Sequence, residues 1–119
     1  MSDGMKCELC EPAPVVCENA LAIARLDNRA LARGHILVIP RRHVADFFEM
    51  TPEERVAVFE LVARAERQIR QEHKPDGYNI GVNVGTAAGQ SRMHVHVHLI
   101  PRYAGDVPDP RGGIRRALE

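Results

Sequence analysis

The chain has 119 residues, of which 45% are hydrophobic, and its 16 basic and 16 acidic side chains balance to a formal net charge of zero. This length suits one domain with its own core, and the balanced charge argues against stable binding to nucleic acid through a general basic field. There is no apolar run near the ~20 residues of a membrane span and no apolar centre of a signal peptide, so we expect a cytoplasmic protein without membrane association.

The first half of the chain is predicted from alternation and from turn residues. In order, we expect an irregular segment around two cysteines (1–14), two short strands with a turn at Glu18-Asn19 (15–26), a connection (27–34) and a buried strand ended by proline (35–40).

A helix is predicted next, because TPEE (51–54) combines three signals for a helix start. Thr51 suits the cap, Pro52 suits the first helical position, and Glu54 completes a capping box. One apolar face at helical spacing continues to about Gln71 and consists of Val58, Leu61, Val62, Ala65 and Ile69. KPDG (74–77) should end the helix.

Two further strands are expected after the helix, at 78–84 and 92–100, joined by the loop 85–90. The Pro- and Gly-rich tail should be extended. Strands outnumber helices, and short loops join adjacent strands, so the predicted class is α+β with a largely antiparallel sheet.

Three histidines occupy alternate positions in the last predicted strand, His94, His96 and His98. Alternate residues of a strand share a face, so the histidines should line one side while valines and a leucine line the other. The outer Cα atoms of such a strand lie ~13 Å apart, whereas zinc needs every ligand nitrogen within ~2.1 Å of one point. One metal shared by all three is therefore excluded, and at least one histidine must have a different role.

The loop GTAAGQS (85–91), directly before the histidines, has two glycines and no large side chain. Its backbone N–H groups, the Gln90 amide and the Ser91 hydroxyl suit phosphate oxygens, although an ordinary hairpin loop is the alternative. A neutral histidine beside a bound phosphate can attack it and form a covalent intermediate that water then opens. A second histidine can stabilise the transferred group or protonate the leaving oxygen.

HVHVHLI resembles the His-x-His-x-His-x-x signature of the histidine triad (HIT) family of nucleotide hydrolases and transferases. CELC, ALAIARLDNRALARGHILVIPRRHV, NIGVNVGTAAGQS and HLIPRYAGD also follow the family's order, so the resemblance covers about residues 7–106. It implies the HIT fold, with a mainly antiparallel five-stranded sheet, one long helix and a short helix. It further implies a single HIT domain over 1–119, with its core at 7–106 and an extended tail at 107–119. A homodimer with a sheet continued across its interface is expected as well.

The resemblance also implies roles for single residues. His96 would be the nucleophile, His98 would contact the phosphate and assist the leaving group, and His35 would support them. Asp27 would bind the ribose hydroxyls, unless it only caps a turn. The positions matched to phosphate contacts are Asn83, Gly89, Gln90 and Ser91. Asn83 could instead satisfy the backbone at a strand end.

Cys7 and Cys10 have the spacing of a zinc knuckle, which needs two more ligands. His43 and His94 are the best candidates, and some members of the family carry zinc on such a Cys₂His₂ set. We therefore predict a structural zinc ion, with a pair of reduced thiols as the alternative.

The substrate class follows from two competing resemblances. HVHVHLIPR resembles the fragile-histidine-triad branch, which cleaves dinucleoside polyphosphates, whereas GQS resembles the branch that cleaves nucleoside phosphoramidates. The leading prediction is a hydrolase of a dinucleoside polyphosphate or similar adenosine nucleotide that forms a His96–nucleoside monophosphate intermediate. The alternatives are a purine nucleoside phosphoramidase, a nucleotide-binding regulatory protein with low turnover, and a redox protein built on the two cysteines.

Overall fold

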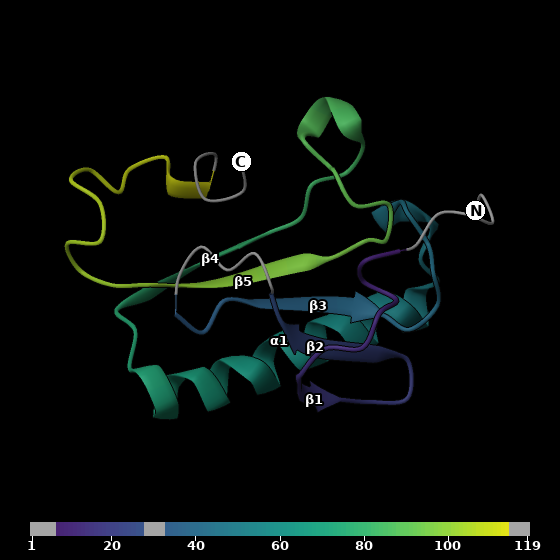
Figure 1. The fold of residues 1–119 in the computed structure, drawn as a ribbon, viewed down its shortest axis with the longest axis horizontal. Coiled ribbons are helices and arrows are strands. Elements are labelled where there is room, and N and C mark those ends of the chain that lie inside the picture. The colour runs from purple at the N-terminus through teal and green to yellow at the C-terminus, as the bar shows by residue number, and fades with distance from the viewer. Residues whose placement is uncertain (1–6, 28–32, 115–119) are drawn as a thin grey trace.

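A computed structural model describes residues 7–27 and 33–114, and its centre is one antiparallel sheet (Figure 1). The five strands lie in the order β1-β2-β3-β5-β4, and each neighbouring pair is antiparallel. Their bounds are β1 Val15–Glu18, β2 Ala22–Leu26, β3 Ile36–Pro40, β4 Gly77–Gly81 and β5 Val97–Arg102. The prediction of an α+β fold with a mainly antiparallel sheet is confirmed.

The long helix α1 spans Pro52–His73 and begins with the predicted capping box. The Thr51 side chain accepts a hydrogen bond from the backbone N–H of Glu54, and the Glu54 carboxylate accepts one from the backbone N–H of Thr51. The helix continues two residues beyond Gln71 and ends at Lys74, whose left-handed backbone cannot continue a helix. Two short 3₁₀ helices are also present, η1 at Phe47–Glu49 and η2 at Thr86–Ala88. No helix in these described ranges is both long and apolar enough to cross a membrane.

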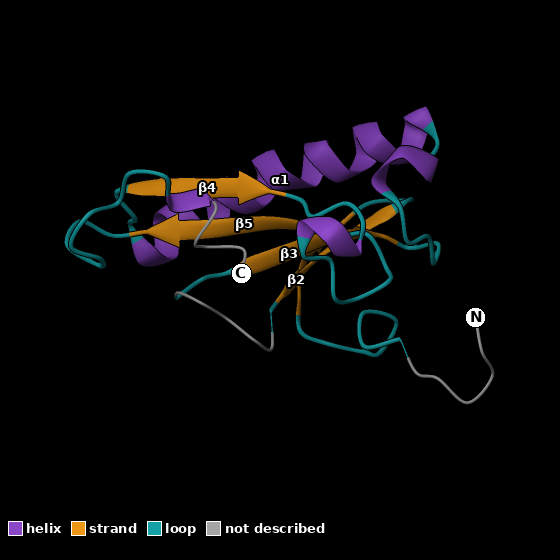
Figure 2. Cartoon of the chain, turned by 90° about the horizontal axis from the view of Figure 1, so that it is seen from above, coloured by secondary structure: helices purple, strands orange, loops and turns teal. Residues whose placement is uncertain are grey.

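Helix α1 covers one face of the sheet, as the view from above shows (Figure 2). Its five predicted apolar residues are buried against alternate residues of the strands, and together they form the main core. The sheet contributes Ala22, Ala24, Ile36, Val38, Val97 and Leu99 to this core. Burial of these side chains is the main driving force for seating α1 on the sheet.

The opposite face carries the other half of each alternating strand. Leu37 and Ile39 of β3 point there and pack with Leu9, so the turn that contains the two cysteines is attached to this face by a second, smaller apolar cluster. The same face receives His35, one residue before β3. All the candidate site residues described below lie on this side of the sheet or beside it.

The histidine segment departs from the regular strand that we expected at 92–100. Pairing in β5 starts only at Val97, because Val95 donates its backbone N–H to the carbonyl of Val44 (2.7 Å) in the loop after β3. β4 correspondingly ends at Gly81, opposite His98, instead of at residue 84, since its partner strand β5 begins only at Val97. The alternation nevertheless persists: Val95 belongs to the main core, and His94 and His96 lie on the side away from it.

Candidate functional site

Sheet pairing places His98 and His35 side by side. Leu37 of β3 is paired with His98 of β5, and His35 projects from the same face two residues earlier. The result is a 3.0 Å contact between His35 Nε2 and His98 Nδ1, in which both residues are buried. Asp27 follows β2 and donates its backbone N–H to the His35 carbonyl, which brings its carboxylate Oδ2 to 3.6 Å from His35 Nε2.

This arrangement determines which ring nitrogens carry protons. The Asp27 carboxylate favours a proton on His35 Nε2, since a carboxylate only accepts hydrogen bonds. His35 Nε2–H then donates to His98 Nδ1, so a neutral His98 carries its proton on Nε2. His98 thus retains one N–H donor for an incoming anion.

His96 is fixed by a main-chain atom. Its Nδ1 lies 2.9 Å from the carbonyl oxygen of His94, and a carbonyl oxygen can only accept, so Nδ1 carries the proton. The lone pair of His96 therefore resides on Nε2. The rings of His96 and His98 are neighbours, with centroids 5.0 Å apart.

Burial keeps this histidine group neutral. It lowers the pKa of His35 and of His96, and it lowers the pKa of His98 to about 3, where the nearby His96 and His35 add to the effect. At neutral pH the nucleophilic form of imidazole, which is the unprotonated one, is therefore the dominant form.

The loop before the histidines is held by Gln90. Its side-chain Oε1 accepts from the Gly85 N–H (2.8 Å), and its Nε2 donates to the carbonyls of Ala45 (2.8 Å) and Arg92 (3.0 Å). We expected the Gln90 amide to bind phosphate. In the structure its oxygen and nitrogen instead make these three hydrogen bonds to the backbone, which hold the loop in its shape.

The other three residues predicted for phosphate binding lie in or beside this loop. Gly89 has a φ of +98°, a conformation that glycine adopts without strain, and a Cβ built on it would lie 3.9 Å from Nδ2 of the neighbouring Asn83. Ser91 is exposed. A phosphate role for Asn83, Gly89 and Ser91 remains a prediction.

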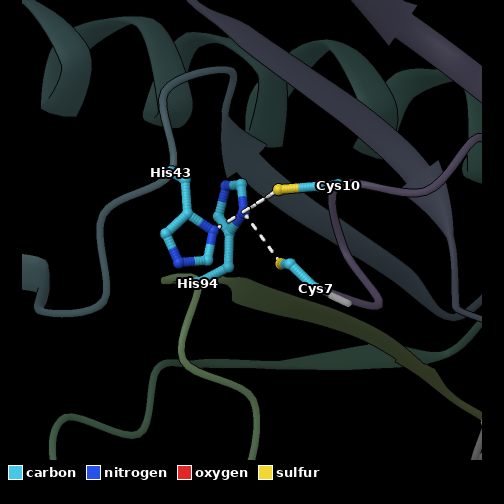
Figure 3. A group of neighbouring side chains, drawn as sticks. All are labelled: Cys7, Cys10, His43 and His94. Carbon is cyan, nitrogen blue, oxygen red and sulfur yellow. Dashed lines mark hydrogen bonds between the residues drawn. The ribbon is translucent and has the colours of Figure 1, made fainter. Parts of the chain in front are cut away.

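The four predicted metal ligands come together at the other end of the histidine segment (Figure 3). The candidate ligand atoms of Cys7, Cys10, His43 and His94 all lie within 4.8 Å of one another. The His94 Nδ1 atom is 3.5 Å from each sulfur, and the His43 Nδ1 atom is 3.4 Å from the Cys10 sulfur.

These distances fit a tetrahedral zinc centre. With zinc–sulfur bonds of about 2.3 Å and zinc–nitrogen bonds of about 2.0 Å at the tetrahedral angle, sulfur and nitrogen would lie about 3.5 Å apart. His94 is also prepared for ligation, because its Nε2 lies 2.8 Å from the Pro40 carbonyl and must donate to it. The lone pair of neutral His94 then resides on Nδ1, which is the atom that faces the sulfurs.

Three charged residues around the site were not identified from the sequence, namely Arg92, Glu8 and Arg25. Arg92 lies between Asp27 Oδ1 (3.4 Å) and Glu8 Oε1 (3.6 Å). Arg25 is buried and donates to the carbonyls of Leu9 (3.1 Å) and Glu11 (3.0 Å), which fixes the backbone on both sides of Cys10. Alternation in β2 offered a signal for Arg25, since it shares the face of Asp27, whereas nothing local in the sequence indicated the partners of Arg92.

Comparisons with known proteins agree with this geometry. The HIT domain model matches residues 9–105. "Protein hit" from Bacillus subtilis is 41% identical over 92 residues, which cover 77% of this chain and 63% of that protein. A Mycobacterium tuberculosis protein named AP-4-A phosphorylase is 36% identical over 97 residues, 81% of this chain and 50% of that protein. The chain thus covers less than two thirds of the length of either relative.

Solved structures show the same fold. A HIT family protein from Bacillus subtilis superposes with a TM-score of 0.78 at 37% identity, covering 85% of this chain and 76% of that one. A Zn-bound histidine triad family protein from Mycobacterium smegmatis gives a TM-score of 0.76 at 35% identity, covering 94% of this chain and 89% of that one. The chain therefore belongs to the HIT family and has its fold, as the resemblance of the sequence implied.

Proposed function

We propose that this protein is a nucleotide hydrolase or nucleotidyl transferase that cleaves a phosphoanhydride of a dinucleoside polyphosphate or a similar adenosine nucleotide. The observation that carries the proposal is the state of His96, a buried neutral imidazole whose Nδ1 donates to a main-chain carbonyl. Its unprotonated Nε2 is the nucleophile. A relative named AP-4-A phosphorylase supports this class of substrate.

The chemistry proceeds in two displacements. His96 Nε2 donates its electron pair to a phosphorus atom, and the bond from that phosphorus to the leaving oxygen breaks, with the electron pair departing on the leaving nucleotide. The His98 Nε2–H donor stabilises the phosphoryl oxygens and, through a hydrogen bond, the negative charge on the leaving oxygen, so that the leaving nucleotide departs as an ionised phosphate. Water or phosphate then attacks the phosphorus, the phosphorus–nitrogen bond breaks with its electron pair returning to His96 Nε2, and the proton of an attacking water passes to solvent.

Asp27 and the loop would orient the nucleotide. The Asp27 carboxylate is a hydrogen-bond acceptor suited to the vicinal hydroxyls of ribose, and Asn83, Gly89, Ser91 and the backbone of Gln90 are proposed for the phosphate side. We keep the expectation of a homodimer, which analytical ultracentrifugation can measure.

The test compares wild type and His96→Ala on diadenosine polyphosphates and adenosine phosphoramidate, with water or inorganic phosphate as acceptor. We expect turnover by wild type alone, and a nucleotidyl adduct on the acid-quenched wild-type protein that mass spectrometry maps to His96. Preference for the phosphoramidate would establish the phosphoramidase alternative. Binding without turnover would establish the regulatory one, and activity retained by His96→Ala would refute the assignment of the nucleophile.

We also infer that Cys7, Cys10, His43 and His94 hold a structural zinc ion. Four protein ligands would complete a tetrahedral shell and leave no position for substrate, so the ion would stabilise the fold and supply no step of the reaction. The matching sulfur–nitrogen distances and the Zn-bound relative support this inference. Metal analysis of protein purified without added metal tests it, with about one zinc per chain expected.

A further inference from the structure

Arg92 links two parts of the molecule that are remote in the sequence. Its Nη1 atom lies 3.4 Å from Asp27 Oδ1, just after β2, and 3.6 Å from Glu8 Oε1, in the turn between the two cysteines. The Arg92 side chain is only 11% exposed and the Asp27 side chain 2%. Ion pairs sheltered from water in this way are screened less and are held more rigidly than pairs on an open surface.

Arg92 is part of a continuous series of polar contacts that joins the cysteine turn to the histidines. Asp27 uses its two oxygens in different directions, Oδ1 toward Arg92 and Oδ2 toward His35 (3.6 Å). His35 in turn contacts His98 at 3.0 Å. The members of the series, in order, are Glu8, Arg92, Asp27, His35 and His98.

The charges around Arg92 argue against a simple role as a phosphate anchor. Two carboxylates face one guanidinium, so the positive charge is already balanced by groups of the protein. What the guanidinium does for Asp27 is more specific. A guanidinium at 3.4 Å from Oδ1 restricts the rotation of the Asp27 carboxylate and so fixes the direction in which its oxygens can accept hydrogen bonds.

Arg92 also retains a donor of its own. Its Nε atom is buried and makes no hydrogen bond within residues 7–27 and 33–114. Buried donors without an acceptor are uncommon and call for an explanation. A ribose hydroxyl bound at Asp27 would provide an acceptor next to the same guanidinium.

We propose that Arg92 is a positioning residue for ribose recognition: it holds the Asp27 carboxylate in place for the ribose hydroxyls of a bound nucleotide and connects it to Glu8 in the cysteine turn. This inference rests on the proposed function, since it requires that the ligand is a ribonucleotide. It adds a specificity determinant to the site, because a nucleotide that lacks the hydroxyls gains nothing from a correctly placed Asp27.

The test measures binding of adenosine monophosphate and of its 2′,3′-dideoxy analogue by calorimetry. We expect Arg92→Met to weaken binding of the ribonucleotide by about tenfold or more, the typical scale for a charge-assisted hydrogen bond, and to change binding of the dideoxy analogue by less than about twofold. Arg92→Lys, which keeps the charge but loses the planar fork, should fall between. Arg64→Met is the matched control, because Arg64 is an exposed residue of α1, which covers the other face of the sheet, and it should change neither affinity.

In turnover assays with a diadenosine polyphosphate as substrate, Arg92→Met should raise KM and leave kcat within about threefold, the pattern of a residue that acts on ground-state and transition-state binding equally. Equal weakening of both ligands would show a phosphate contact or a general loosening and would overturn the proposal. So would an unchanged affinity for the ribonucleotide.

Failure of the proposed function gives a different result, in which wild type neither binds adenosine monophosphate nor turns over a diadenosine polyphosphate. The Arg92–Asp27 link is then judged without any ligand, from unfolding equilibria of Arg92→Met, Asp27→Asn and the double variant. The effect of the double substitution on the unfolding constant is compared with the product of the effects of the two single substitutions. A difference of about fivefold or more would support the link, and agreement within about twofold would overturn it.

Discussion

The neighbouring histidines His94 and His96 bind main-chain carbonyls through opposite ring nitrogens. His94 donates from Nε2 to Pro40 and keeps its lone pair on Nδ1, facing two sulfurs. His96 donates from Nδ1 to His94 and keeps its lone pair on Nε2. Two residues of one type, both buried and both neutral, are thus prepared for different chemistry by the carbonyl that each one meets. The backbone around a histidine, as much as its side-chain neighbours, therefore determines what the ring can do.

The sharpest way to separate the two histidines is His96→Ala. Loss of the proposed nucleophile should lower kcat/KM by on the order of 10³ or more, because the proposed covalent intermediate can no longer form. Zinc content should stay near that of wild type, since His96 is not among the four candidate ligands, whereas thermal stability should fall because a buried ring and its hydrogen bond to the His94 carbonyl are lost. His73→Ala, at the C-terminal end of α1, is the control and should keep full activity. Loss of zinc from the His96 variant would show that the two sites are not separable.

The reciprocal experiment is Cys10→Ser. Removing one thiolate should abolish tight zinc binding and lower the free energy of unfolding by about 3 kcal/mol, because binding energy at a structural site is folding energy. Turnover per folded molecule should change far less, within about fivefold, when it is measured well below the melting temperature. A variant that stays as stable as wild type, or that loses activity while still folded, would contradict the proposed division of roles, in which the cysteine–histidine cluster is structural and His96 and His98 are catalytic.

Acid should lower the free energy of unfolding through the buried His98. The pKa of His98 is lowered to about 3 in the folded protein, against ~6.5 in an unfolded chain. Below pH ~6.5 the unfolded chain binds a proton that the folded chain does not. The free energy of unfolding therefore falls as the pH falls from ~6.5 toward 3, by up to about 1.4 kcal/mol per pH unit for this residue.

Denaturant unfolding between pH 7 and 5 measures this slope, and the Cys10→Ser background removes the contribution of zinc release. Adding His98→Asn in that background should make the dependence on pH shallower by about one proton. An identical slope with and without His98 would show that its protonation is not linked to folding.

The smallest expected effect concerns the loop at 85–90, which Gln90 holds in place. Gln90→Ala removes three hydrogen bonds to the backbone and leaves their partners at Gly85, Ala45 and Arg92 unpaired. We expect a loss of about 1–2 kcal/mol in the free energy of unfolding, together with a raised KM if the loop binds phosphate. The exposed neighbour Ser91 is the control, and Ser91→Ala should cost less than about 0.5 kcal/mol. Equal effects of the two substitutions would show that the hydrogen bonds of Gln90 do not stabilise the loop.

Local patterns in the sequence predicted much of this molecule. The capping box before α1, the apolar stripe of the helix and the buried strand that ends at Pro40 are all local, and each is found as expected. The four candidate zinc ligands also lie together, although the two histidines are far from the cysteines in the sequence; here the resemblance to the HIT family, and not a local signal, supported the choice of His43 and His94. Where local signals suffice, sequence and structure agree.

The differences arise where a residue has partners far along the chain. The start of β5 shifts because Val95 pairs with Val44, a contact that alternation does not reveal. Gln90 is chemically suited to a phosphate and equally suited to peptide groups, and only the folded loop decides between them. Arg92 meets Glu8 and Asp27 only after the N-terminal turn is packed on the sheet, so its importance could not be predicted from its neighbours in the sequence.

The main-chain partner of His96 has a consequence for engineering. Side chains around a ring can be exchanged, but a carbonyl oxygen persists through any substitution that preserves the backbone path. The tautomer of His96 is therefore set by the course of the backbone and does not depend on which side chain stands at residue 95. Variants of this stretch can be screened for the proposed activity without changing which nitrogen of His96 carries the proton.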